Sequence, residues 1–212
     1  MFTGLIQDLG TVRQVVGSAP RRIEIGTALP TGGFAIGESI ACNGVCLTVV
    51  SVSAGSFEVD AGAETLALTT ATAWAPGQTL HLERALALGD RLGGHLVLGH
   101  VDGQGRVTAA RTERGGWFLE IAAPPAVLPF LLPKGSVTID GVSLTVNDLR
   151  GDRFSVFLIP ETLRRTVLSR VSLGAFVNLE ADILGKYVAR LLSHTQPLPG
   201  VTLATLREAG FA

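Results

Sequence analysis

Short apolar or alternating runs, each of strand length, recur along most of the chain. The clearest are Arg22–Ile25, Cys46–Val50 and Ser56–Asp60, and glycine, alanine or serine closes each of them. A buried helix is the other structure that short apolar runs can form, but none of the three reaches the ~10 residues that a helix normally needs. The pattern therefore predicts many short β-strands joined by tight turns.

The pattern changes after residue 182, where apolar residues recur at three- and four-residue spacing. They are Leu184, Val188 and Leu191, and the polar face of the same stretch carries Lys186, Arg190 and His194. This spacing predicts an amphipathic helix. Thr202–Ala209 predicts a second short helix, with Thr202 as its N-cap. The apolar face can pack on its own domain or on copies of the chain, and the sequence leaves both open.

The chain contains an internal repeat. Asn43–Val49 lies over Asp140–Val146 at a shift of 97 residues, and five of the seven positions are identical. The same shift places Glu64–Leu66 over Glu161–Leu163 and Leu82-Glu83 over Leu179-Glu180; near the starts of the halves the shift is 95, with Gly4 over Gly99. Three separated matches at one shift indicate two homologous halves.

The repeat defines the expected domain organisation. We predict an all-β fold, a tandem of two homologous six-stranded Greek-key β-barrels with a C-terminal α-helix. The expected domains are residues 1–92, residues 93–182 and a helical segment over residues 183–212. Closing a small antiparallel sheet into a barrel hides its edges, although a β-sandwich remains the alternative.

Composition excludes several classes of protein. The chain has 17 Lys and Arg against 18 Asp and Glu, so no basic surplus exists to bind nucleic acid or an anionic membrane. Mean hydropathy is +0.41, yet polar residues interrupt every uncharged stretch, and the N-terminus lacks the pattern of a secretion signal. We therefore expect a cytoplasmic protein. Two cysteines are too few for a disulfide scaffold or, alone, for a metal site.

The repeated motif predicts two similar pockets for two similar ligands. Strand alternation places Cys46 and Thr48 on one face, and Ser143 and Thr145 on the equivalent face of the other half. Ahead of these pairs lie Asn-Gly and Asp-Gly dipeptides, which predict hairpin turns. The turn residues Asn43 and Asp140 differ in acid-base capacity, so the two pockets are expected to be alike in shape and unlike in chemistry.

Three further positions differ between the halves. His95 and His100 lie in the glycine-rich stretch Gly93–Gly103, and Lys134 stands where the first half has Gly37. Glycines let backbone approach a ligand closely, but single histidines are more often structural, and an isolated lysine is usually a solvated charge. Metal binding would need further ligands at a recognised spacing, and the sequence contains none.

These residues together resemble the alpha-type riboflavin synthase family over the whole length of the chain. The motifs that carry the resemblance are Met1–Gly4, Asn43–Thr48, Gly93–His95, Gly99–Gly103, Asp140–Thr145, Ile159–Leu163, Lys186–Val188 and Leu206–Phe211. Leu98 departs from the polar residue expected there, which puts one side-chain contact at the second pocket in doubt.

The resemblance implies an enzyme without a cofactor. Two 6,7-dimethyl-8-ribityllumazine molecules would react, one giving a four-carbon unit to the other, to form riboflavin and 5-amino-6-ribitylaminouracil. It also implies a homotrimer held by the C-terminal helices, with each reaction site between the first barrel of one subunit and the second barrel of its neighbour. Any association with lumazine synthase is left open.

The resemblance also implies site residues. The first pocket is expected to use Gly4, Leu5, Ile6, Cys46, Leu47, Thr48, Asp60, Ala61, Gly62, Ala63, Glu64 and Thr65. The second is expected to use Gly99, His100, Val101, Lys134, Ser143, Leu144, Thr145, Phe157, Leu158, Ile159, Pro160, Glu161 and Thr162. The resemblance implies that His100 transfers the proton. Cys46 and Ser143 would each act as a nucleophile or as an orienting hydrogen-bond partner. Asp140, Lys134 and Asp182 would give electrostatic support.

Two other classes compete with the enzyme. A non-catalytic homologue that holds lumazine or flavin as an optical antenna would lose polar groups from the second pocket, whereas this chain keeps them. A flavin-using reductase is disfavoured because no dinucleotide-binding glycine motif follows a strand and opens a helix.

Overall fold

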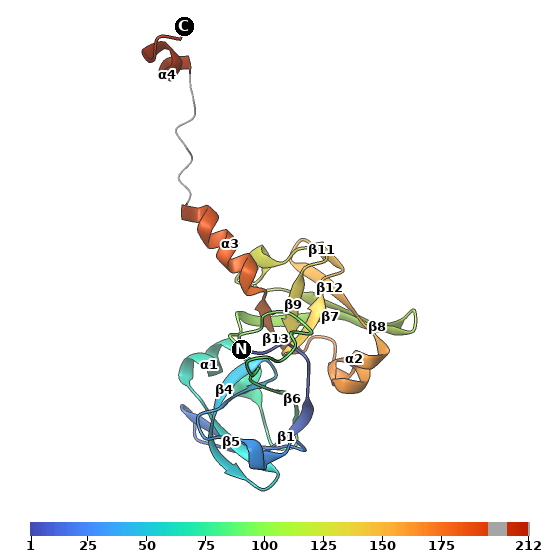
Figure 1. The fold of residues 1–212 in the computed structure, drawn as a ribbon. Helices are drawn as coiled ribbons and strands as arrows, with labels where there is room; N and C mark the ends of the chain where they lie inside the picture. Colours follow the sequence, from blue (N-terminus) through green and yellow to red (C-terminus); the bar gives the residue numbers. More distant parts are fainter. Residues whose placement is uncertain (195–202, 212) are drawn as a thin grey trace.

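The first half of the chain forms a closed antiparallel barrel. The structure, a computed structural model, describes residues 1–194 and 203–211. Six strands close the barrel in the order β1-β2-β5-β4-β3-β6 (Figure 1). They are β1 (Asp8–Val16), β2 (Arg21–Gly26), β3 (Ser39–Cys42), β4 (Val45–Ser53), β5 (Ser56–Ala61) and β6 (Thr79–Arg84), accompanied by α1 (Ala63–Leu68), η1 (Thr31–Gly33) and η2 (Thr70–Ala73). The three strands predicted from apolar runs lie within β2, β4 and β5.

The second half forms a curved seven-stranded sheet in the order β10-β9-β13-β7-β8-β12-β11. Its elements are β7 (Gly103–Glu113), β8 (Gly116–Ala122), β9 (Ser136–Ile139), β10 (Val142–Thr145), β11 (Asp148–Arg150), β12 (Arg153–Leu158) and β13 (Phe176–Ala181), with α2 (Pro160–Arg165), η3 (Leu128–Phe130) and η4 (Leu168–Arg170).

The two edge strands of this second sheet are pieces of one interrupted strand. The counterpart of the continuous strand β4 is divided into β10 and β11, and Asn147 between them donates its N–H to the carbonyl of Ser155 at 2.8 Å. The predicted class, two repeated antiparallel β-domains followed by a helix, is confirmed. We call this second domain, whose seven-stranded sheet has β10 and β11 as its edges, the second half-barrel.

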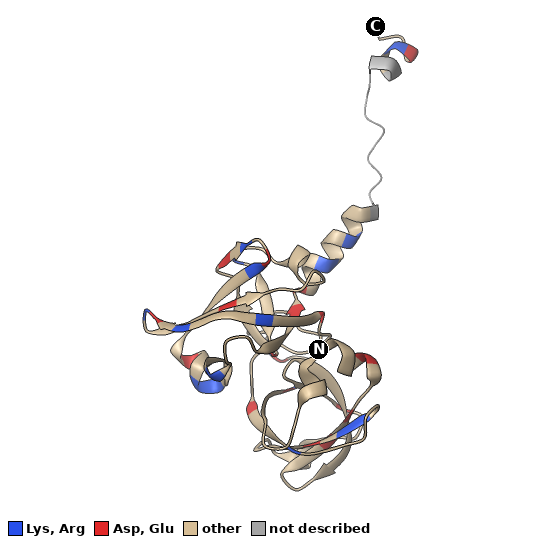
Figure 2. Ribbon diagram, turned by 180° about the vertical axis from the view of Figure 1, so that it is seen from behind, with Lys and Arg blue, Asp and Glu red and all other residues tan. Residues whose placement is uncertain are grey.

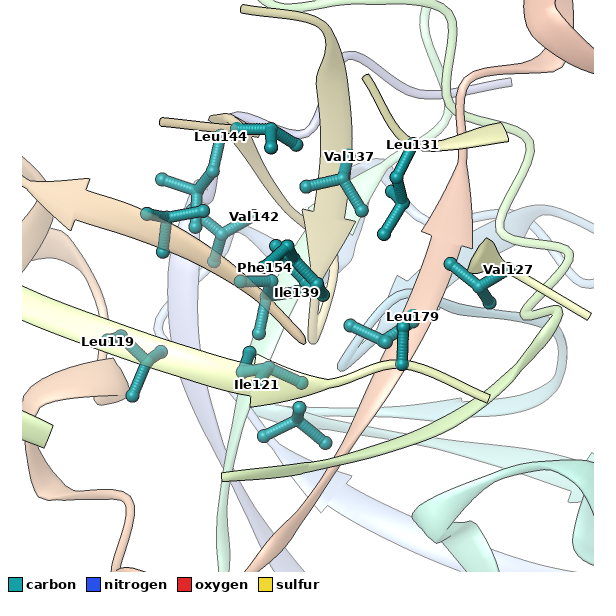
Figure 3. Packing of buried hydrophobic residues seen from close by; sticks show 14 of the residues in the cluster. Leu119, Ile121, Val127, Leu131, Val137, Ile139, Val142, Leu144, Phe154 and Leu179 are labelled. Atoms are coloured by element: carbon teal, nitrogen blue, oxygen red, sulfur yellow. The ribbon is translucent and has the colours of Figure 1, made fainter. Parts of the chain in front are cut away.

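Each half has its own hydrophobic core. Strand alternation directs one face of every strand inwards, so that Leu47 and Val49 of β4 are buried while Thr48 between them is exposed. The core of the second half is built the same way from β8, β9, β12 and β13, where Ile121, Ile139 and Phe154 pack together (Figure 3).

The predicted amphipathic helix is α3 (Ile183–His194), which projects away from the second half-barrel (Figure 1). Leu184, Val188 and Leu191 are all exposed on it. The second short helix is α4 (Leu203–Glu208), and its expected N-cap, Thr202, lies outside the described residues.

The two halves meet at their hairpin turns, which confirm the turn prediction. Asn43 and Gly44 have φ of 45° and 76°, and Asp140 and Gly141 have φ of 47° and 80°, the left-handed values of a type I′ turn. A Cβ added to Gly44 would lie 2.6 Å from the backbone nitrogen of Gly141. Glycine is therefore required at both turns by conformation and by the contact between them.

Candidate ligand-binding pockets

Two extended segments cross between the halves. We call Phe2–Ile6 the first arm and Val97–Val101 the second arm. The arms pair with each other through Phe2 and Val97, whose backbone groups exchange hydrogen bonds of 2.7 and 3.1 Å. Beyond this bridge, each arm runs onto the barrel of the other half.

Backbone hydrogen bonds hold each arm against the opposite barrel. The carbonyl of Gly4 accepts the N–H of Ser143 at 2.8 Å, and the carbonyl of Gly99 accepts the N–H of Cys46 at 2.9 Å. A Cβ on Gly4 would lie 2.6 Å from the Ser143 Cβ, and one on Gly99 would lie 2.7 Å from the Cys46 Cβ. Only glycine allows this approach.

Each arm forms one wall of a pocket on the outside of the barrel it reaches. The first pocket, on the first barrel, is a hollow of about 240 Å³ lined by Val45, Cys46, Glu64, Thr65, Leu68, Thr69, Gly99, His100 and Val101. The second pocket, on the second half-barrel, is a hollow of about 290 Å³ lined by Gly4, Leu5, Ile6, Val142, Ser143, Glu161, Thr162, Arg165 and Thr166. Every lining residue of one pocket has its repeat counterpart in the other.

Three of these matched positions differ in chemistry. The first pocket has His100, Cys46 and Leu68 where the second has Leu5, Ser143 and Arg165. The Arg165 Nε donates to Glu161 at 3.0 Å, and this hydrogen bond lowers the pKa of the Glu161 carboxyl. The pockets are thus alike in shape, whereas a titratable ring lines only the first and a guanidinium only the second.

A buried histidine, His95, contacts the lining residue Ser143 of the second pocket. The His95 Nδ1 lies 2.7 Å from the Ser143 Oγ, and burial lowers the pKa of the ring, which favours the neutral form. Its Nε2 is buried without a hydrogen-bond partner among the described residues. A neutral imidazole can accept the hydroxyl proton of Ser143, so this pair can make the serine oxygen a better acceptor or nucleophile.

The predicted pairing of arms with pockets was wrong. The sequence places Gly4–Ile6 in the first half and Gly99–Val101 in the second, and we expected each to serve its own half. The structure puts Gly4, Leu5 and Ile6 beside Ser143, and Gly99, His100 and Val101 beside Cys46. The arms cross because their bridge lies at the contact between the two halves.

Four predicted binding residues have side chains that pack in the hydrophobic cores. Leu47 and Leu144 alternate with the pocket residues of their strands and therefore point inwards. Ala61 and Leu158, at the ends of β5 and β12, are fully buried for the same reason.

Two of the predicted electrostatic residues lie apart from the pocket linings. Asp140 is buried at the contact between the halves, where its Oδ1 accepts the N–H of Asn178 at 2.8 Å and burial raises its pKa to about 7. Lys134 occupies an exposed turn with φ of 69°, the left-handed conformation of its counterpart Gly37.

The other predicted residues are not among the residues that line the two pockets. Asp182 directly precedes α3, with its Oδ1 accepting the N–H of Leu184 at 3.0 Å. Asp60 forms two hydrogen bonds with Arg22, at 2.9 and 2.8 Å. The remainder lie on outward-facing strand positions or at the starts of α1 and α2: Thr48, Gly62, Ala63, Thr145, Phe157, Ile159 and Pro160.

Sequence reasoning missed six lining residues, three in each pocket. They are Val45, Leu68, Thr69, Val142, Arg165 and Thr166. The 97-residue shift aligns each of the first three with one of the last three, so a closer comparison of the halves could have found them.

The described residues hold no group of three or more His, Cys, Asp or Glu side chains arranged to bind a metal ion. Within the same residues, no helix is long and apolar enough to cross a membrane.

Comparisons with known proteins agree on one family. A sequence model of the lumazine binding domain matches residues 3–85 and again residues 98–182. The riboflavin synthase of Brucella abortus (strain 2308) is 43% identical over 200 residues, covering 92% of this chain and 99% of that protein. The riboflavin synthase of Actinobacillus pleuropneumoniae is 37% identical and covers all of both chains. The crystal structure of LumP complexed with riboflavin has a TM-score of 0.77 at 23% identity and covers 85% of this chain and 99% of that chain, which shows a shared fold.

Proposed function

This chain belongs to the riboflavin synthase family, and we propose that it converts two molecules of 6,7-dimethyl-8-ribityllumazine into riboflavin and 5-amino-6-ribitylaminouracil. One lumazine gives a four-carbon unit to the other, and the proposed reaction uses no cofactor. The expected compartment is the cytoplasm.

One observation carries this proposal: the chain has two pockets with matched linings and unmatched chemistry. The two reactants are identical, so one pocket shape duplicated suits both of them. Their roles differ, because one molecule loses the unit that the other gains, so the pockets must treat them differently. The exchange of Cys46 for Ser143 and of His100 for Leu5 supplies that difference.

We propose that the working site lies between subunits of a homotrimer. The first pocket of one subunit would face the second pocket of its neighbour, and the exposed apolar face of α3 supports assembly. Leu184, Val188 and Leu191 are each more than half exposed in the single chain, a pattern typical of an interface. Holding two heterocycles face to face removes much of the entropic cost of their encounter.

We assign the chemical roles from the family resemblance together with the geometry of the pockets. His100 takes a proton from the C7 methyl group of one lumazine, because an imidazole can titrate near neutral pH. Cys46 and Ser143 act as nucleophile or orienting hydrogen-bond partner, and His95 supports Ser143. Lys134 and Asp182 supply electrostatic support, whereas we assign Asp140 to the contact between the halves.

The stoichiometry of the reaction tests the proposal. Purified protein incubated with the lumazine alone should consume two molecules for each riboflavin formed, and a metal chelator should not change the rate. Absorbance and chromatography measure both products. Binding of lumazine without riboflavin formation would instead identify an antenna-type binding protein, and zinc-restorable loss of activity on chelation would contradict the cofactor-free mechanism.

A further inference from the structure

Two buried glutamates occupy the same place in each half. Glu83 lies near the end of β6 and is 3% exposed, and Glu180, its counterpart on β13, is 2% exposed. Neither is among the residues lining the two pockets. A carboxylate is costly to bury unless hydrogen bonds compensate for lost hydration.

Each carboxylate binds two successive backbone N–H groups of one arm. The Glu83 Oε1 and Oε2 accept the N–H groups of Thr3 and Gly4, at 2.7 and 2.9 Å. The Glu180 oxygens accept the N–H groups of Leu98 and Gly99, at 2.8 and 2.9 Å. In both halves, therefore, each of the two carboxylate oxygens accepts one backbone N–H group of the arm.

This hydrogen-bond pattern fixes an irregular backbone. In a strand, successive N–H groups point in opposite directions, so both can meet one carboxylate only where the chain curves. Gly4 and Gly99 supply the curve, with φ of 77° and 76°. Successive N–H groups in such a curve form a natural binding site for an anion. Burial raises the pKa of both glutamates, to about 7 for Glu180, while these N–H groups oppose the rise.

Each glutamate belongs to one half of the chain but holds an arm that lines the pocket of the other half. Glu83 belongs to the first barrel, but the arm it holds forms a wall of the second pocket beside Ser143. Glu180 belongs to the second half-barrel, but its arm forms a wall of the first pocket beside Cys46 and carries His100.

From this geometry we propose that Glu83 and Glu180 are positioning residues, each of which sets the shape of the pocket on the opposite barrel. The inference rests on the proposed function for its catalytic consequence. Its structural part is that each glutamate fixes the arm lining the pocket of the opposite half. That part follows from the hydrogen bonds alone and is tested separately.

We call each glutamate, together with the two backbone N–H groups that it binds, a clamp. The two clamps differ in the other groups that stabilise the carboxylate. Thr3 Oγ1 adds a hydrogen bond of 2.6 Å to Glu83, whereas Leu98, its counterpart, has no hydroxyl to give Glu180. Near Glu180 lies instead the ion pair of Lys186 with Asp102, at 2.7 Å. Lys186 belongs to α3 and favours the charged form of Glu180, so the second clamp is linked electrostatically to the C-terminal helix.

Thiol alkylation of the full-length protein tests the first pocket. Cys46 is half-buried under Gly99, while Cys42 is fully buried and reports any general unfolding. Glu180→Gln keeps the size of the side chain but turns an amide N–H₂ towards one backbone N–H. We expect iodoacetamide to modify Cys46 about tenfold faster in this variant, from the loss of one charge-assisted hydrogen bond. Glu83→Gln is the matched control and should leave the Cys46 rate unchanged.

The repeat supplies the converse experiment. In a Cys46→Ser, Ser143→Cys background the reporter thiol lies in the second pocket, and Glu83→Gln should now accelerate its alkylation while Glu180→Gln should not. Faster modification on the glutamate's own barrel, or equal acceleration of both sites, would overturn the proposal. Faster modification of Cys42 would also overturn it, by showing that the glutamates only maintain the fold.

Turnover then tests the catalytic consequence. Both glutamine variants should lower kcat more than they raise KM for the lumazine, since the arm remains but its position is no longer fixed. Unchanged kcat with the crossed alkylation pattern would limit the clamps to a structural role. The alkylation result does not depend on riboflavin formation, so failure of the proposed function and failure of this inference are distinguishable.

Discussion

Single residues, rather than whole segments, distinguish the two pockets. His100 stands opposite Leu5 in the repeat, Cys46 opposite Ser143, and Leu68 opposite Arg165, while the surrounding glycines and threonines match. A duplicated scaffold that keeps its backbone can change chemistry in this way without changing shape. The chemical difference between the two pocket linings is therefore concentrated in a few side chains.

At this scale, His100→Ala should lower kcat on the order of 100-fold or more, because proton transfer to a positioned group typically contributes that much. The other walls of the first pocket remain, so lumazine affinity should change little. Steady-state kinetics and a separate binding titration measure the two effects. Leu5→Ala, the same trimming in the second pocket, is the control and should affect affinity more than kcat. Wild-type turnover of the His100 variant would show that this ring is not the proton carrier.

At the scale of secondary-structure elements, the main contact between the two halves is the one between the hairpin turns of β3–β4 and β9–β10. Asn178 Nδ2 donates to the carbonyl of Asn43 at 2.9 Å, and its repeat counterpart His81 places Nδ1 2.9 Å from the carbonyl of Asp140. The His81 Nε2 accepts the N–H of Val167 at 3.0 Å. Nδ1 must therefore carry the single proton of a neutral ring. The contact between the halves thus depends on an uncharged histidine.

This neutral ring predicts a pH dependence of stability. Burial lowers the pKa of His81 from 6.5 to about 4. The unfolded chain binds the proton more tightly, so the stabilisation is complete above pH 6.5 and is lost as the pH falls towards 4. The shift corresponds to about 3 kcal/mol at most. His81→Gln removes this titration, so the stability advantage of the wild type should shrink by that order between pH 6.5 and 4.

Denaturant unfolding of both proteins at several pH values measures this difference. Asp140 and Glu180, whose pKa values are raised by burial to about 7, remain in both proteins and cancel in the comparison. A stability difference that stays constant with pH would mean that His81 is not neutral in the folded protein or does not contribute through its charge.

In the whole molecule, the two halves are joined by their arms and turns, and α3 projects from the second half (Figure 1). Basic and acidic residues are interspersed along the ribbon (Figure 2), consistent with the formal net charge of -1. The apolar residues Leu184, Val188 and Leu191 of α3 are each more than half exposed in the single chain.

Ending the chain after Asp182 should therefore separate folding from assembly. Both hydrophobic cores remain, so the halves should stay folded and bind a flavin-like ligand, but riboflavin formation should collapse because the two lumazines are no longer held together. Sedimentation, ligand fluorescence and a turnover assay measure the three properties. The truncation also removes Lys186, so full-length Lys186→Met controls for its ion pair with Asp102. A monomeric truncation with full activity would place the site within one chain.

The sequence alone determined the local structure of this protein. Apolar periodicity defined β2, β4 and β5, Asn-Gly and Asp-Gly defined the turns, and the 97-residue shift revealed the two halves and their paired site residues. Each of these signals is local, because side-chain direction and turn geometry depend on residues near one another in the chain.

Only the tertiary structure decided which half each segment serves. The repeated barrels present nearly the same surface, so an arm such as Gly4–Ile6 fits either, and no periodicity records the choice. The interruption after Thr145 that divides one strand into β10 and β11, and the burial of Asp140 against Asn178, depend likewise on contacts between residues distant in the sequence. Such contacts depend on how the two halves pack against each other. The pattern of apolar and polar residues along the chain describes the local structure of each half but not that packing.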